Sequence, residues 1–89
     1  MSIVIESRGL EKKEPPFYIF RFAILRDGEE FMESLARYVH REEGGKVQFM
    51  EPDMRRIQQL PNSIEQLNEL ERVILEDARL TLGEEPPSQ

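Results

Sequence analysis

The segment from Phe17 to Leu25 constrains the fold more than any other part of the sequence, because it holds four of the seven aromatic residues and one charge, Arg21. Successive side chains of a strand point to opposite faces. The segment therefore predicts a strand whose two faces are Tyr18, Phe20, Phe22, Ile24 and Phe17, Ile19, Arg21, Ala23, Leu25. Both faces are apolar apart from Arg21. A chain of 89 residues has few elements to cover them, so we expect some of this surface to be shared with a partner.

The length and composition indicate one small domain, which we expect to span residues 1–82. A chain of this size buries only about 60–65% of its unfolded surface, so its margin of stability is narrow. Residues 83–89 consist of glycine, glutamate, proline, serine and glutamine. Such a composition lacks the apolar side chains needed for a core, and it predicts a disordered C-terminal tail.

The absence of cysteine and the single histidine narrow the possible chemistry. Without cysteine there is no disulfide framework, no thiolate zinc site and no cysteine nucleophile. Small secreted domains usually depend on disulfides, so we expect a cytoplasmic protein. We predict no metal or other cofactor.

Charge and hydropathy exclude two further classes of target. Twelve basic and eighteen acidic side chains give a net charge of −6, which opposes binding to nucleic-acid phosphates. The adjacent basic pairs, Lys12-Lys13 and Arg55-Arg56, both have acidic neighbours. No apolar run approaches the ~20 residues that span a bilayer, and residues 1–6 lack the features of a signal peptide. We therefore expect a soluble chain that binds neither nucleic acid nor membrane.

Hydrophobic spacing predicts strands at 3–5, 17–25 and 46–50, with a loop over residues 7–16. Between the second and third strands we predict a helix that begins near Asp27 and ends at Gly44-Gly45. Asp27 and Glu30 have the spacing of a capping box. The apolar residues of this predicted helix recur at helical spacing: Phe31, Met32, Leu35, Ala36, Tyr38 and Val39.

Two more helices are predicted in the C-terminal third. One begins at Glu51-Pro52 and stops before Pro61. The other begins at Asn62-Ser63, where Ser63 and Gln66 suggest another capping box. Its apolar stripe comprises Ile64, Leu67, Leu70, Val73, Ile74 and Ala78. Such a stripe is usually the core of its own domain, although it could also be a dimerisation seam.

The resulting fold class is α+β, in the order strand, strand, helix, strand, helix, helix. The links around the first helix are short, and a tight strand–helix–strand unit usually places its strands parallel. We therefore predict a small mixed three-stranded sheet. The last two helices would cover either face of the sheet or a neighbouring molecule.

The candidate catalytic and metal-binding residues lack a recognisable context. His40 and Glu43, with Glu33 further back, provide one imidazole and no thiolate, too few good ligands for a typical metal site. Ser34 and Ser63 have no nucleophile motif, and the paired carboxylates fall at expected helix ends or in the tail. We therefore predict that the isolated chain is not an enzyme. Arg21 could bind an anion or form a buried pair with a carboxylate such as Glu6, but its stem is more simply expected to lie along the sheet with its charge in water.

The sequence thus favours a small acidic protein-interaction module, either a homodimer or an adaptor or regulatory subunit. The aromatic strand and the C-terminal helix would carry its contacts, through Phe17, Ile19, Arg21, Leu67, Leu70 and Ile74. One alternative is an accessory subunit or small-ligand sensor with an anion site near Arg21. Another is an acidic inhibitor of a nucleic-acid-binding protein, although arginines interrupt the acidic helix faces.

Overall fold

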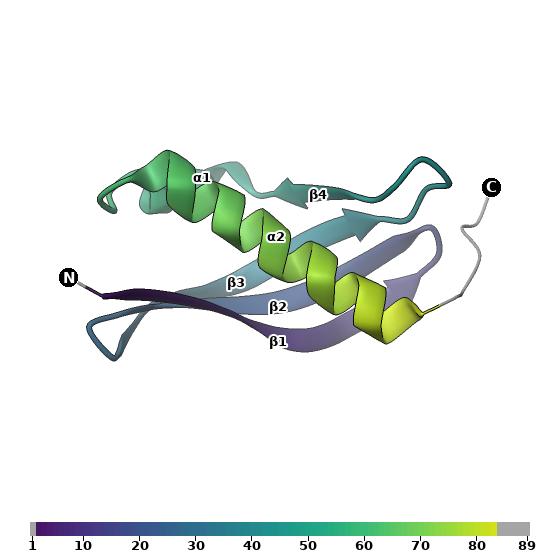
Figure 1. The fold of residues 1–89 in the computed structure, drawn as a ribbon, viewed down its shortest axis with the longest axis horizontal. Helices are drawn as coiled ribbons and strands as arrows, with labels where there is room; N and C mark the ends of the chain where they lie inside the picture. Colours follow the sequence, from purple (N-terminus) through teal and green to yellow (C-terminus); the bar gives the residue numbers. More distant parts are fainter. Residues whose placement is uncertain (1, 84–89) are drawn as a thin grey trace.

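The computed structural model describes residues 2–83 and shows an α+β fold in which two helices pack against a four-stranded antiparallel sheet (Figure 1). The strands lie in the order β1-β2-β3-β4. The elements are β1 Ile3–Glu14, β2 Phe17–Arg26, β3 Glu29–Val39, β4 Lys46–Phe49, α1 Glu51–Ile57 and α2 Ser63–Leu82. The predicted α+β class is confirmed. The predicted mixed three-stranded sheet is wrong, because every paired strand is antiparallel and a fourth strand replaces the first helix.

The predicted helix that would begin at Asp27 is instead strand β3, and the turn before it explains why. Asp27 has a φ of 52° and Gly28 a φ of 84°, the two positive values that a type I′ hairpin turn requires. Arg26 and Glu29 pair directly across this turn. The Asp27 carboxylate accepts a hydrogen bond of 2.8 Å from the Ser2 backbone N–H, far away in sequence, rather than capping a helix.

The side chains of β3 alternate with period two. Met32, Ala36 and Tyr38 are buried, whereas the intervening Glu33 and Arg37 are exposed. An irregularity in the pairing of β2 with β3 places Ile24 opposite Met32 and the next residue, Leu25, opposite Glu30. Phe31 is the extra residue of this bulge. Its apolar side chain next to that of Met32 imitates the spacing of an amphipathic helix.

The segment predicted as a loop, 7–16, continues β1 as far as Glu14. Gly9, with a φ of 98°, lies within an irregularity of the β1–β2 ladder that lets the strand continue. Pro15 and Pro16, joined by a cis peptide bond, form the two-residue connection to Phe17. Gly44 and Gly45 lie between β3 and β4 rather than at a helix end.

The remaining predicted elements are confirmed with small differences. The predicted strand 46–50 is β4, and the two C-terminal helices begin at Glu51 and Ser63. The second capping box is not formed: the N-cap of α2 is Asn62, in a left-handed conformation and without a side-chain cap. Gly83 is the C-cap of α2. The rest of the predicted tail, 84–89, lies outside the described residues.

The core lies between the sheet and α2, which crosses one face of the sheet diagonally (Figure 1). Of the two faces predicted for β2, the first is buried: Tyr18, Phe20, Phe22 and Ile24. From α2 they meet four buried side chains: Leu70, Ile74, Ala78 and Leu82. Most of the helix stripe is therefore the domain's own core, the use that its spacing favoured. Ile64, the first residue of the predicted stripe, is 75% exposed and does not belong to the core.

Two serine hydroxyls on the buried side of the sheet fix the helices to the strands. Ser7 of β1 donates to the Asp77 carboxylate of α2, and Ser34 of β3 donates to Asp53 of α1 at 2.6 Å. Asp77 also accepts a hydrogen bond of 3.0 Å from Thr81. These contacts hold both helices on one side of the sheet. The opposite side, called the open face below, is where the second set of β2 side chains lies.

Candidate functional site

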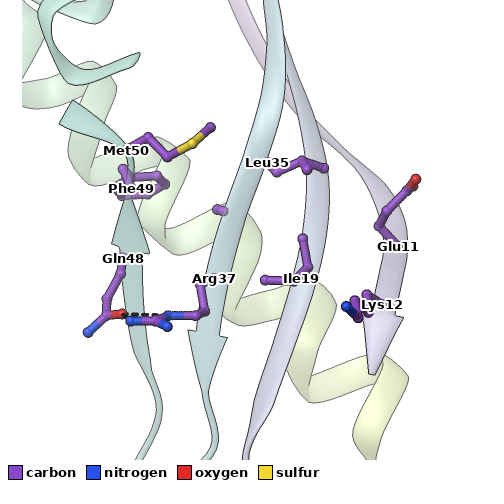
Figure 2. A pocket seen from close by; sticks show the side chains of 9 residues that line it. Glu11, Lys12, Ile19, Leu35, Arg37, Gln48, Phe49 and Met50 are labelled. Atoms are coloured by element: carbon purple, nitrogen blue, oxygen red, sulfur yellow. Dashed lines mark hydrogen bonds between the residues drawn. The ribbon is translucent and has the colours of Figure 1, made fainter. Parts of the chain in front are cut away.

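The open face consists of the strand side chains that alternate with those of the core. Figure 2 looks onto this face, with α2 behind the sheet. In the centre, five pairs of residues from β2 and β3 lie opposite each other across the ladder: Phe17 and Val39, Ile19 and Arg37, Arg21 and Leu35, Ala23 and Glu33, Leu25 and Glu30. Strands β1 and β4 flank these pairs. The predicted contact residues Phe17, Ile19 and Arg21 thus lie on one surface.

A network of ion pairs occupies the middle of the open face. The Arg21 guanidinium contacts Glu11 at 2.7 Å and Glu33 at 3.0 Å. Arg8 contacts the same Glu33, and it also pairs with Glu6 at 3.1 Å and Glu30 at 3.0 Å. Arg21 thus pairs with carboxylates, one of the alternatives suggested for it, but the suggested partner, Glu6, is wrong. Glu6 pairs with Arg8, the cation on its own strand.

The network holds Glu33 in its ionised form. Hydrogen bonds from Arg8, and then from Arg21, lower the pKa of the Glu33 carboxyl below its ordinary value. Conversely, hydrogen bonds to Glu11 and then to Glu33 raise the pKa of Arg21 above its already high value. All of these groups are at least partly exposed to solvent, so the network organises the surface more than it stabilises the fold.

An apolar area adjoins the ion pairs. Phe17, Leu35 and Met50 are 40%, 37% and 51% exposed, and Ile19 between them is half-buried. These residues, apart from Phe17, help to line a hollow of about 730 Å³, together with Glu11, Lys12, Ala36, Arg37, Gln48 and Phe49 (Figure 2). Exposed apolar side chains around a hollow are typical of a surface that binds another molecule.

Arg37 is positioned beside this apolar area. Its guanidinium carbon lies 5.0 Å from the centre of the Phe17 ring, within the range of a cation–π contact. Its Nε donates to the Gln48 side chain at 2.7 Å (Figure 2). Neither Phe17 nor Gln48 carries a negative charge, and Arg37 takes no part in the ion pairs of Arg8 and Arg21 described above.

The open face is electrically balanced, although the chain as a whole is acidic. Its cationic side chains are Arg8, Lys12, Arg21, Arg37 and Lys46, and its acidic ones are Glu6, Glu11, Glu14, Glu30 and Glu33. The two sets are equal in number, so the net charge of −6 resides on the other surfaces and the termini. An acidic partner, or a second copy, would meet less repulsion here than elsewhere on the molecule.

The structure separates the six predicted contact residues. Leu70 and Ile74 are completely buried beneath the sheet, and Leu67 is half-buried against the same core. They lie on the other side of the sheet from the open face. Their burial leaves no exposed surface through which Leu70 and Ile74 could contact a partner while the fold is intact.

The sequence interpretation missed Leu35 and Met50 as surface residues. The spacing of the apolar residues places Leu35 in the stripe of a helix, and Met50 at the end of the predicted strand 46–50. The Asp27-Gly28 pair, a strong hairpin signal between apolar segments, is the signal that could have identified this segment as a strand and so placed Leu35 on the open face.

His40 has a structural environment of its own. Its Nδ1 lies 3.0 Å from the Tyr38 hydroxyl, and its ring meets the Tyr18 ring edge-on at a centroid distance of 6.1 Å. Burial raises the pKa of Tyr38. Within residues 2–83, no group of three or more histidine, aspartate and glutamate side chains could hold a metal ion.

No protein-family model matches the chain, and comparison with curated proteins and with solved structures finds no significant match. Neither of the two described helices is long and apolar enough to cross a membrane. The open face is therefore the feature from which a function can be inferred.

Proposed function

We propose that this chain is an acidic protein-interaction module that binds its partner through the open face of the sheet. The observation that carries the proposal is the apolar area around Ile19 and Leu35, which lines the hollow on the side of the sheet that α2 does not cover. The sequence predicts contacts to the partner from the C-terminal helix, but its Leu70 and Ile74 are buried. Strand β3 takes its place through the exposed Leu35. The lack of cysteine continues to favour a cytoplasmic location.

The electrostatics of the open face favour binding over catalysis. A general acid or base works best when its pKa lies near the working pH. The pKa of Glu33 is lowered and that of Arg21 is raised, so both shifts move away from neutrality. A surface of permanently charged, mutually paired groups beside an apolar area is instead suited to recognition.

Neither alternative function gains support from a specific contact. An anion at Arg21 would have to displace Glu11 and Glu33, which already occupy the guanidinium. An acidic mimic of nucleic acid would need an uninterrupted row of carboxylates. On α2, Glu69 is paired with Arg72 at 2.5 Å and Glu76 with Arg79 at 2.7 Å.

Photo-crosslinking in cells tests the proposal. A photoreactive amino acid is placed at position 35 on the open face or, as a control, at position 64. Ile64 is a suitable control because it is 75% exposed on α2, on the other side of the sheet. We expect position 35 to crosslink to protein far more strongly than position 64. Equal crosslinking, or none at position 35, would contradict a partner on the open face.

A further inference from the structure

We propose that the partner on the open face is a second copy of this chain, stacked sheet to sheet about a two-fold axis that runs across the strands. This inference rests on the proposed function, and it adds the identity and the orientation of the partner. Its basis is an asymmetry of charge along the open face.

The charges of the open face are arranged around the central pair, Arg21 and Leu35. On β3, Glu33 lies two residues from Leu35 on the side of the Asp27 turn, and Arg37 lies two residues from Leu35 on the opposite side. A two-fold axis across the strands reverses the strand direction. It would therefore bring Glu33 of one copy over Arg37 of the other. An axis along the strands would instead place acidic ends together, at a cost in repulsion.

Strand β1 repeats this arrangement independently. Glu6 lies opposite Ala23, and Lys12 lies opposite Ile19, so the two charges flank the same central pair on opposite sides. The axis that brings Glu33 to Arg37 would thus also bring Glu6 to Lys12. In an isologous contact the same surface of both copies meets itself, so residue i of one copy contacts residue j of the other and the reverse. A single two-fold axis would produce such contacts on both strands here.

The apolar side chains are compatible with the same stacking. The small Ala23 of one copy would face Ile19 of the other, and Leu25 would face Phe17. Leu35 would lie next to its own equivalent at the axis, and so would Arg21, whose charge is already paired with Glu11 and Glu33. Facing sheets interdigitate across about 10 Å, and alternating small and large side chains suit this spacing.

The dimensions and the charge distribution also suit a second copy. Four strands about 4.8 Å apart and a ten-residue β2 give a footprint of about 600 Å² per copy before side-chain relief is counted. A standard interface buries about 800 Å² per partner, so a modest affinity is expected. Because α2 covers the opposite face of the sheet, the acidic α2 helix of each copy would lie on the outside of the dimer, away from the contact.

Complementary charge reversals test this orientation. We expect Glu6→Lys and Lys12→Glu each to weaken self-association about tenfold, because each change places like charges together at both ends of the contact. An equimolar mixture of the two variants should associate again. In the mixed dimer, position 6 of one copy meets position 12 of the other with opposite charges, and the second such contact is unchanged. Sedimentation velocity measures all three samples.

Lys13→Glu is the matched control for this experiment. It makes the same charge change on the same strand, but residue 13 lies opposite Tyr18 on the helix side of the sheet. We expect its self-association to match that of the unmodified chain. Failure of the mixture to recover, or an equal loss in the Lys13→Glu variant, would overturn the proposed stacking.

Single-cysteine crosslinking provides a second test, since the chain contains no cysteine. Leu35→Cys should give a covalent dimer with a short bismaleimide, because residue 35 lies beside the axis. Leu25→Cys should not, because two equivalent residues 25 would be about 26 Å apart along the strands. Crosslinking of Leu25→Cys as efficient as that of Leu35→Cys would contradict the orientation of the axis.

The two proposals can fail separately. If the purified chain is monomeric but position 35 crosslinks to another protein in cells, the second copy is wrong and the interaction surface stands. If position 35 crosslinks to nothing and the chain is monomeric, both proposals are wrong.

Discussion

Arg21 and Leu35 lie directly opposite each other on β2 and β3, at the centre of the open face. The Arg21 charge is already held by Glu11 and Glu33, whereas 37% of Leu35 is exposed. A partner could therefore cover the apolar side chain without leaving the neighbouring cation unpaired.

We predict that Phe20→Ala and Phe22→Ala each lower the free energy of unfolding by about 3–5 kcal/mol, the usual cost of truncating a buried aromatic side chain. Both side chains are fully buried between the sheet and α2. Phe17→Ala is the control on the same strand, because Phe17 lies on the open face. Urea unfolding measures the three variants. A loss for Phe22→Ala no larger than that for Phe17→Ala would show that the core is assigned to the wrong face.

Gly45 lies so close to Tyr38 that it has no room for a side chain. A Cβ atom at position 45 would be 1.9 Å from Cε1 of the Tyr38 ring, well inside van der Waals contact. We predict that Gly45→Ala lowers the free energy of unfolding by about 1–3 kcal/mol, the range for overpacking. Thermal or urea unfolding measures the change.

The Tyr38→Leu background is the control for this substitution, because it removes the ring atoms that the new methyl group would meet. We expect Gly45→Ala to cost much less there than in the unmodified chain, so the two changes should be strongly non-additive. Equal losses in both backgrounds would mean that the ring does not constrain Gly45.

The ion pairs of the open face predict a dependence of stability on pH. Arg8 and Arg21 lower the pKa of Glu33 in the folded state below its value of about 4.5 in the unfolded chain. A carboxyl with a lowered pKa contributes stability that is present above the unfolded pKa and is lost as the pH falls through the folded pKa. We therefore expect Glu33→Gln to be less stable than the unmodified chain at pH 7.

This difference in stability should shrink as the pH falls below about 4.5 and disappear below the lowered folded-state pKa, where Glu33 is neutral in both states. Urea unfolding at several pH values from 7 to 2.5 measures it. Glu14→Gln, on the same face but outside the Arg8 and Arg21 contacts, is the control variant. A difference that stays constant over this range would show that the stabilisation does not come from the Glu33 charge.

The strand 17–25 and the C-terminal helices could be predicted from the sequence because their signals are local and strong. The four aromatic residues of the strand strongly favour a β-strand, and the apolar residues from Leu67 to Ala78 recur at the spacing of an amphipathic helix. The buried face of β2 and the core role of Leu70 and Ile74 follow from the same patterns. In these elements local preference and tertiary packing agree.

Strand β3 could not be predicted by spacing alone, because its bulge at Phe31 produces apolar neighbours that resemble a helix stripe. The Asp27-Gly28 pair fits a helix start through the capping-box spacing of Asp27 and Glu30, but an Asp-Gly pair between apolar segments is also a strong hairpin signal. A helix at this position would not form a sheet face, so the open face, which includes Leu35 of β3, could not be predicted. The ion pair of Arg21 with Glu11 could not be predicted either, because Glu11 lies in the part of β1 that the sequence predicts as a loop.

The most direct test of the central claim is sedimentation equilibrium of the purified chain at micromolar to hundred-micromolar concentrations, with Leu35→Glu as the interface variant and Ile64→Glu as its control. We expect the unmodified chain and Ile64→Glu to shift with concentration from 10.5 kDa toward twice that mass, about 21 kDa, and Leu35→Glu to remain near 10.5 kDa. An unmodified chain that stays at 10.5 kDa throughout, or a Leu35→Glu variant that associates equally well, would contradict stacking through the open face.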